Sequence, residues 1–276
     1  MGSSKLLKRF PRLNAAYHGY RECKHMLRPP VKNPQGFWFT GNKLMQSGQF
    51  EPEETQLVQE MLGDVDVLIN IGANIGYYCC MALEREKHVI AFEPLPKNVE
   101  YLTRNIALNG MAESIEIFPI ALSSSCGIAK FYGGGTGASL IEGWAGQAQD
   151  QVTLVPMSTL DVVLGTRMQG KRCLVLIDVE GSELAMLQGA SKLLANSPRP
   201  VWFVEISVNE HQPTGTLLNP NLVATFELFL NAGYHAFTAS RDSRRVLLNE
   251  VKHVAATGED TLQTHNFIFR AAQEHC

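Results

Sequence analysis

A short turn and a carboxylate at a set distance from it predict a ligand that contains a ribose. A β-rich run ends in the sequence NIGANIG at residues 70–76, which leads into a helical pattern. Glycines at such a turn let the main chain approach a ligand and place N–H groups at a helix N-terminus. Glu93 ends the next β-rich run, 21 residues after Gly72. A carboxylate at that separation can accept hydrogen bonds from both ribose hydroxyls.

The turn also discriminates between cofactors. A dinucleotide site uses three glycines to accommodate a pyrophosphate, and Asn74 stands at the middle position of that spacing. S-adenosylmethionine has no pyrophosphate, so its site needs only a turn that admits the amino-acid part and a carboxylate for the ribose. The residues therefore favour S-adenosylmethionine over NAD, and a dinucleotide-dependent oxidoreductase is the alternative.

Three carboxylates and a histidine are candidates for acid–base chemistry. Asp178, Glu180 and Glu205 fall at the ends of two further β-rich runs, at the sheet edge where ligands bind in open α/β folds. Methyl transfer to a hydroxyl needs a general base within hydrogen-bond reach, which Asp178 can supply while Glu180 or Glu205 orients the substrate. Glu180 could instead cap the next helix. His211 is a second candidate base, and the alternative for this residue is an ordinary surface position.

Carboxylates of this kind could also bind a divalent metal ion with hard oxygen ligands. The spacing does not require one, and we assign no metal ligands.

These residues must be positioned by alternating strands and helices, which indicate a mainly parallel sheet covered by helices. We expect strands at 65–71, 88–93, 114–122, 173–178, 201–206, 234–239 and 265–269. We expect helices at 75–85, 96–108, 182–195 and 222–230.

Two segments depart from this alternation. Residues 127–161 resemble a strand pair, at 128–132 and 152–157, followed by a short helix that Ser158 caps, with Asp161 three residues on. Residues 1–50 form an N-terminal extension with a basic amphipathic helix and a loop rich in proline, glycine and aromatic residues. We therefore expect an extension at 1–50 and a Rossmann-like domain at 51–276, with a β insertion at 127–161.

The motifs resemble, in order, those of the FkbM-type family of S-adenosylmethionine-dependent methyltransferases. The matching blocks are LINIGANIGYY at 68–78, AFEPLPKN at 91–98, NIALN at 105–109, ALS at 121–123, STLD at 158–161 and IDVEGSE at 177–183. The resemblance implies a class I methyltransferase fold, with a mainly parallel seven-stranded sheet and helices on both faces. It also implies O-methylation of a hydroxyl on a sugar, a glycolipid or a small natural product.

The resemblance assigns further residues by position. It implies that the methionine end of the cofactor lies at Gly72, Asn74 and Gly76, and that the ribose lies at Glu93. It also implies that Ala121 and Leu122 lie near the adenine and that Ser139 faces the substrate.

This chain departs from the family pattern at two positions. Asn70 replaces the acid that usually precedes the glycines, so the cofactor pocket loses a charge there. Leu176 stands where the family often has lysine, so no ammonium group is expected beside Asp178. These two departures keep a non-catalytic, methyltransferase-like binding module as an alternative.

Charge is distributed unevenly along the 276 residues, whose formal net charge is −3. Residues 1–32 carry eight lysine and arginine residues against one glutamate, a net +7, whereas the remainder, with 16 basic and 26 acidic residues, carries −10. An acidic body argues against nucleic acid as a partner. The amphipathic helix of the basic head could simply pack its apolar face on the domain. The functional alternatives are a lid over the substrate, a homodimer contact or a peripheral contact with an anionic membrane. No signal-peptide pattern and no CxxC pair occur, so we expect a reducing cytoplasm.

Overall fold

The computed structural model describes residues 29–134, 137–147 and 151–271. The chain divides into two units, residues 1–50 and 51–276. The predicted amphipathic helix of the N-terminal extension, together with its proposed membrane, lid and dimer roles, falls mostly at residues 1–28, outside the described residues. No helix in the described ranges is long and apolar enough to cross a lipid bilayer.

The described part of the first unit is a small hairpin followed by one helical turn. Strand β1 (Val31–Lys32) pairs antiparallel with β2 (Trp38–Phe39). Helix α3 (Lys43–Ser47) begins at Asn42, whose side chain accepts hydrogen bonds from two main-chain N–H groups of the first turn. The extension therefore contains regular structure where the sequence suggested only a loop.

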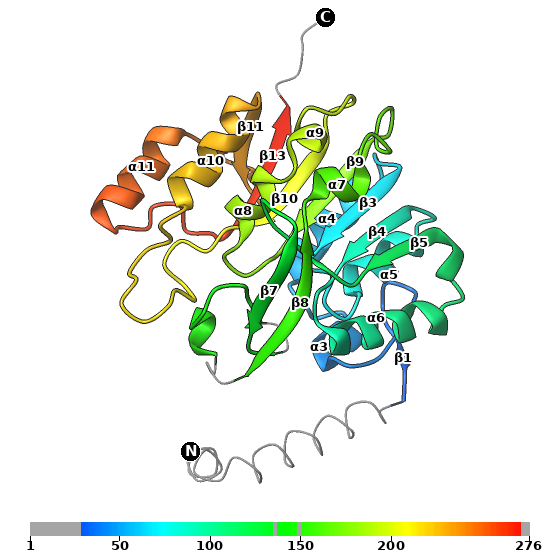
Figure 1. The fold of residues 1–276 in the computed structure, drawn as a ribbon. Coiled ribbons are helices and arrows are strands. Elements are labelled where there is room, and N and C mark those ends of the chain that lie inside the picture. The colour runs from blue at the N-terminus through cyan, green and yellow to red at the C-terminus, as the bar shows by residue number, and fades with distance from the viewer. Residues whose placement is uncertain (1–28, 135–136, 148–150, 272–276) are drawn as a thin grey trace, which may run out of the picture. The chain divides into compact units, whose positions relative to one another are not determined.

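An eight-stranded, mainly parallel sheet organises the second unit (Figure 1), in the order β12-β11-β13-β10-β9-β3-β4-β5. Its strands are β3 (Val67–Ile71), β4 (His88–Phe92), β5 (Ile115–Phe118), β9 (Cys173–Ile177), β10 (Val201–Glu205), β11 (Tyr234–Thr238), β12 (Arg245–Val246) and β13 (Asn266–Ala271). The expected class I methyltransferase fold is confirmed. The sheet has eight strands rather than seven, because the two-residue strand β12 pairs with β11 at one edge.

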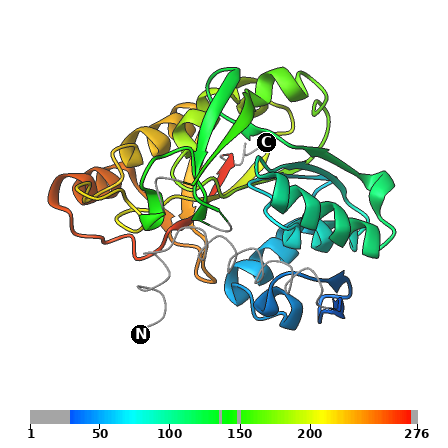
Figure 2. The same cartoon turned by 60° about the horizontal axis from the view of Figure 1, so that its bottom comes forward.

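Helices cover both faces of this sheet, as Figures 1 and 2 show from two directions. One face carries α4 (Pro52–Leu62), α5 (Tyr77–Leu83) and α6 (Pro96–Leu108). The other carries α7 (Leu160–Leu164), α8 (Glu183–Gln188), α9 (Ser191–Leu194), α10 (Leu222–Asn231) and α11 (Leu248–Thr257). Strands β3 and β9 are buried at every residue, as a strand covered on both faces must be, which explains why their residues are apolar except for Asn70.

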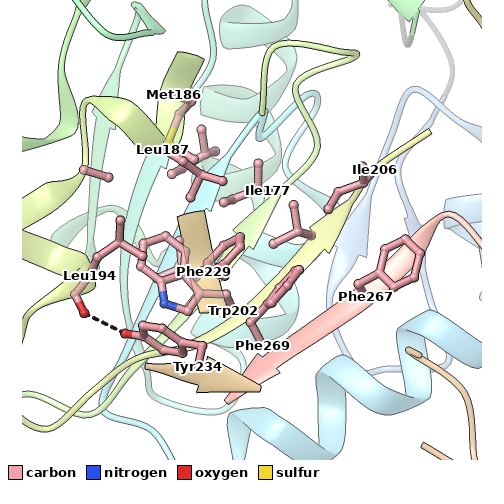
Figure 3. Close-up of a cluster of buried hydrophobic side chains, with 14 of the residues drawn as sticks. Ile177, Met186, Leu187, Leu194, Trp202, Ile206, Phe229, Tyr234, Phe267 and Phe269 are labelled. Carbon is pink, nitrogen blue, oxygen red and sulfur yellow. Dashed lines mark hydrogen bonds between the residues drawn. The ribbon is translucent and has the colours of Figure 1, made fainter. Parts of the chain in front are cut away.

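An aromatic cluster fixes the strand that ends in Glu205. Trp202 of β10 packs edge-to-face on Phe229 of α10, and Phe229 stacks on Phe269 of β13 at 3.8 Å between ring centroids (Figure 3). The hydroxyl of Tyr234 donates a hydrogen bond to the carbonyl oxygen of Leu194 at 2.9 Å, so this buried polar group is satisfied. The packing holds β10 against its neighbours and so sets the position of its carboxyl end.

The predicted strand at 114–122 is two strands in different sheets. Strand β5 belongs to the main sheet, whereas β6 (Ala121–Leu122) pairs with β8 (Val152–Ser158). Pro119 lies between them, and because proline has no N–H it cannot extend a ladder of hydrogen bonds. The expected strand pair is confirmed, since β7 (Gly127–Tyr132) runs antiparallel to β8.

The predicted helix at 182–195 is also divided, into α8 and α9. A β-carbon on Gly189 would lie 2.2 Å from the carbonyl oxygen of Ser123, so the chain approaches another segment too closely for a continuous helix with side chains. Helix α9 begins anew where Asp161 accepts hydrogen bonds from Ser191 Oγ and the Lys192 main-chain N–H. Asp161 therefore caps α9, whereas α7 is capped one residue later than expected, by Thr159, which accepts from the Val162 N–H at 3.1 Å.

Candidate active site

A pocket of about 560 Å³, measured with its open mouth, lies at the carboxyl ends of the parallel strands. It is formed by the turns after β3, β4 and β9, by the segment around β6 and by the insertion. Five of the residues predicted to bind the cofactor line it: Gly72, Asn74, Glu93, Ala121 and Leu122.

Gly72 allows the turn after β3 to lie directly against the turn after β9. Its φ is +84°, and a β-carbon there would lie 1.8 Å from the carbonyl oxygen of Asp178. The Asp178 N–H donates to the carbonyl oxygen of Ile71 at 3.0 Å, which fixes this approach. Only glycine fits both the backbone conformation and the space.

Glu93 is the central polar group of the pocket. Its side chain accepts hydrogen bonds from the Asn74 N–H at 2.8 Å, the Leu95 N–H at 2.9 Å and the Asn98 amide at 3.2 Å. Burial raises the pKa of Glu93, and these three donors act in the opposite direction. A carboxylate has about four acceptor positions, so Oε2, which accepts one of the three bonds, can accept another from a ligand hydroxyl.

The remaining wall of the pocket is apolar. Leu95 packs in a small core with Ala121, Phe131, Ala138 and Val155, which joins the insertion to the turn after β4. Apolar residues that line the pocket on this side are Leu95, Ile120, Leu122, Phe131 and Leu140. Such a surface is suited to a flat, weakly polar ring such as adenine.

Two predicted cofactor residues lie outside the lining. Asn70 is 1% exposed, and its amide nitrogen lies 3.4 Å from Cys79 Sγ, on the side of the sheet that α5 covers. Gly76 begins α5, and a β-carbon there would lie 2.3 Å from Leu102 Cδ1 of α6. The structure thus places Gly76 at a helix–helix contact and Asn70 beneath the turn, and their contact with a cofactor stays a prediction.

The opposite side of the pocket is strongly acidic. Burial, followed by the charges of Glu205 and Glu180, raises the pKa of Asp178 well above its ordinary value. Burial and neighbouring carboxylates also raise the pKa of Glu205 to about 8. Asp178 and Glu180 line the pocket, and Glu205 lies on the adjacent strand. The cluster would be stabilised by a cationic ligand, because a nearby positive charge favours the ionised form of each acid.

The insertion holds Glu180 by contacts that the sequence did not predict. Trp144 Nε1 donates a hydrogen bond to Glu180 Oε2 at 2.6 Å. Ser139 is fully buried, and its hydroxyl donates to the Glu180 carbonyl oxygen at 2.6 Å and accepts from the Ile141 N–H at 2.9 Å. The Ser139 hydroxyl is therefore engaged within the chain, and its predicted contact with the substrate stays a prediction. Glu180 does not act as a helix cap, because α8 begins after Ser182 and no side chain caps it.

His211 lies near this cluster but not in the pocket lining. Its ring centroid is 6.3 Å from that of Trp144, and its carbonyl oxygen accepts from the Ala145 N–H at 2.7 Å. Its positive charge, when present, lowers the pKa of Glu180. His211 thus lies next to Trp144 and close enough to Glu180 to influence its pKa, but outside the pocket lining.

Glu183 is a further buried acid of the site. It is 3% exposed, and its Oε1 accepts from the Gly181 N–H at 2.8 Å, which closes the turn after β9. Burial raises its pKa to about 7. Its place in the block IDVEGSE was the available signal, but nothing else in the sequence distinguishes it from an ordinary helix residue. Within the described ranges, no group of three His, Cys, Asp or Glu side chains is arranged to hold a metal ion.

Comparison with known proteins agrees with this architecture. The family model described as the methyltransferase FkbM domain matches residues 70–236, more than half of the chain. No curated protein matches the chain by sequence.

Similar solved structures include an FkbM methyltransferase from Methylobacillus flagellatus, which is 16% identical with a TM-score of 0.43. The match covers 75% of this chain and 44% of that protein, so this chain spans less than half its length. A TehB-like SAM-dependent methyltransferase from Corynebacterium glutamicum is 12% identical, with a TM-score of 0.39 and coverage of 82% and 89%. Likenesses at these TM-scores carry no conclusion about activity.

Proposed function

The chain belongs to the FkbM methyltransferase family, and on that premise we propose that it transfers a methyl group from S-adenosylmethionine to a hydroxyl of a sugar, glycolipid or other small acceptor. The observation that carries the proposal is a single pocket with two different sides. One side has Glu93 and an apolar wall, and the other has Asp178 and Glu180.

The residues present fit the cofactor. Glu93 would accept a hydrogen bond from a ribose hydroxyl through the remaining acceptor position of Oε2. Ala121 and Leu122, together with Ile120, would lie at the adenine, and the turn at Gly72 would admit the amino-acid part. When bound, S-adenosylmethionine supplies an electrophilic methyl group on a positively charged sulfur.

Asp178 is the residue best placed to act as the general base. It lies at the pocket beside the Gly72 turn, and its raised pKa makes its ionised form a stronger proton acceptor than an ordinary aspartate. It would take the proton of the acceptor hydroxyl as the methyl group passes to the hydroxyl oxygen, with the carbon–sulfur bond breaking as the carbon–oxygen bond forms. Glu180 and Glu205 would orient the acceptor through hydrogen bonds to its other hydroxyls.

Calorimetric titration with S-adenosylmethionine tests cofactor use directly. We expect binding by the wild-type chain and a marked loss in Glu93→Ala. Lack of binding at millimolar cofactor, or unchanged binding in Glu93→Ala, would contradict the proposal. Binding of NADH in the same experiment would instead support the oxidoreductase alternative.

The acceptor can be found with a labelled methyl group. A cell extract is incubated with the chain and isotope-labelled S-adenosylmethionine, and mass spectrometry locates the molecule that gains the label. A labelled sugar, glycolipid or small hydroxyl compound supports the proposal. If no S-adenosylhomocysteine is released, the chain is better explained as a non-catalytic binding module.

A further inference from the structure

Trp144 is buried against the turn that follows β9. It is 2% exposed, and its ring fills the space beside Gly181, where a β-carbon would lie 2.5 Å from a ring carbon. An indole N–H is a donor only, so when buried it requires an acceptor. Glu180 Oε2 provides that acceptor at 2.6 Å.

The main chain of Glu180 is held from the same segment. Its carbonyl oxygen accepts from Ser139 Oγ at 2.6 Å, and its φ of +52° is uncommon for a residue other than glycine. Such a conformation persists only where the surrounding contacts determine it, and it occurs often at functional sites. Residues 139–144 therefore fix both the main chain and the side chain of Glu180.

The charges around Glu180 explain why its carboxylate needs to be held in place. Glu180 interacts electrostatically with the carboxylates of Asp178, Glu183 and Glu205. Glu51 and Glu210 add negative charge to the same cluster, and the group that lowers the pKa of Glu180 by its charge is His211. Repulsion from the carboxylates favours a Glu180 side chain turned away from the pocket. A charge-assisted hydrogen bond from Trp144 opposes that movement.

We propose that Trp144 is a positioning residue, whose indole N–H holds the Glu180 carboxylate at the acceptor side of the pocket. The inference rests on the proposed function, because it makes Glu180 a group that orients the acceptor. Oε2 accepts one hydrogen bond, from the indole, whereas no hydrogen bond to Oε1 occurs among the described residues. Oε1 thus has the more open acceptor positions for an acceptor hydroxyl, while Asp178 takes the proton of the hydroxyl that is methylated. An acceptor with at least two neighbouring hydroxyls, such as a saccharide, fits this pair of carboxylates.

The indole N–H can be observed without knowing the acceptor. The chain has three tryptophans, so a nitrogen–proton correlation spectrum of the full chain should show three indole signals. Trp144→Phe identifies the relevant signal by its loss, and Trp202 supplies a buried reference indole outside the site. We expect the Trp144 signal to shift as Glu180 titrates, above the ordinary glutamate pKa, while the Trp202 signal stays constant.

Two variants decide which group causes the shift. In Glu180→Gln the Trp144 signal should persist but lose its pH dependence, because the amide oxygen still accepts and does not titrate. In His211→Gln the pH dependence should remain. A Trp144 signal that does not titrate in the wild-type chain, or that titrates unchanged in Glu180→Gln, would overturn the inference.

Cofactor binding and methyl transfer separate this inference from the proposed function. Trp144→Phe should bind S-adenosylmethionine as the wild-type chain does, yet transfer label to the same extract fraction about ten- to a hundred-fold more slowly, as expected for loss of a hydrogen bond to a charged group. A control substitution at an exposed position, Glu113→Gln, should keep the wild-type rate per folded molecule. Normal transfer by Trp144→Phe would overturn the positioning role, whereas absence of cofactor binding in all variants would instead overturn the proposed function.

Discussion

Gly72 lies so close to Asp178 that no side chain fits between them, since a β-carbon on Gly72 would be 1.8 Å from the Asp178 carbonyl oxygen. This approach joins the glycine turn after β3 to the acidic edge. The two motifs are more than a hundred residues apart in the sequence, yet one cannot move without the other. Stability, cofactor binding and methyl transfer should all depend on this contact between the two turns and on the groups around it.

Gly72→Ala should destabilise the chain and abolish cofactor binding. The β-carbon would meet main-chain atoms, which cannot rotate away, and the φ of +84° adds strain, so we expect a loss of at least about 2 kcal/mol in the free energy of unfolding. Urea unfolding and calorimetry measure the two effects. Gly110→Ala is the matched control, because Gly110 also has a positive φ but nothing lies within 4 Å of its added β-carbon. Equal effects of the two substitutions would contradict the close-approach explanation.

Glu93→Gln should weaken S-adenosylmethionine binding while the chain stays folded. The amide keeps the size of the side chain but removes the charge that accepts from two main-chain N–H groups and that would accept from the ribose. We expect a loss of about 1.5–3 kcal/mol in binding free energy, or roughly ten- to 150-fold in Kd. Calorimetry measures this loss, and the exposed Glu113→Gln serves as control. An unchanged Kd would show that the ribose lies elsewhere.

Glu183 should make the folded chain less stable as the pH rises. Its folded-state pKa of about 7 exceeds its ordinary value of 4.5, so between these pH values the folded chain binds more protons than the unfolded chain. The free energy of unfolding therefore falls across this window, by roughly 3 kcal/mol at most. Urea unfolding at several pH values measures the slope, which should be smaller in Glu183→Gln. The same slope in both chains would contradict this assignment.

Cofactor binding should release protons near neutral pH. The pKa values of Asp178 and Glu205 are raised by burial and by repulsion from neighbouring carboxylates, and a sulfonium cation in the pocket would favour their ionised forms. We expect affinity for S-adenosylmethionine to rise with pH, with proton release measured by calorimetry in buffers of different ionisation enthalpy. S-adenosylhomocysteine, whose sulfur is neutral, should release fewer protons. Equal release by both ligands would place the sulfur away from these acids.

Asp178→Asn should remove methyl transfer and keep cofactor binding. A positioned general base contributes roughly a hundred- to ten-thousand-fold to a rate, and an amide cannot accept the proton. Label transfer to the acceptor fraction measures the loss, with the exposed Asp64→Asn as control. Full turnover in Asp178→Asn would show that another residue is the base.

Much of the fold follows from local sequence patterns. The sequence predicted the alternation of strands and helices and the boundaries of α6. The mostly apolar strands β3 and β9 were also predictable, because burial on both faces of a parallel sheet requires apolar side chains. The errors occurred where distant segments meet. Gly189 breaks a helix because of Ser123, and β5 and β6 separate at Pro119 into different sheets.

The candidate site also has features that the sequence predicted and features that it did not. By itself, the sequence determined the types of its groups: a glycine turn, a carboxylate for a ribose, an acidic edge and a resemblance to FkbM-type methyltransferases. Only the tertiary structure decided which of them meet. It placed Asn70 beneath the turn and joined Ser139 and Trp144 to Glu180, contacts that span 41 and 36 residues. No sequence period encodes such distances, because they depend on how the insertion packs against the sheet edge, and the raised pKa values depend on the burial that this packing produces.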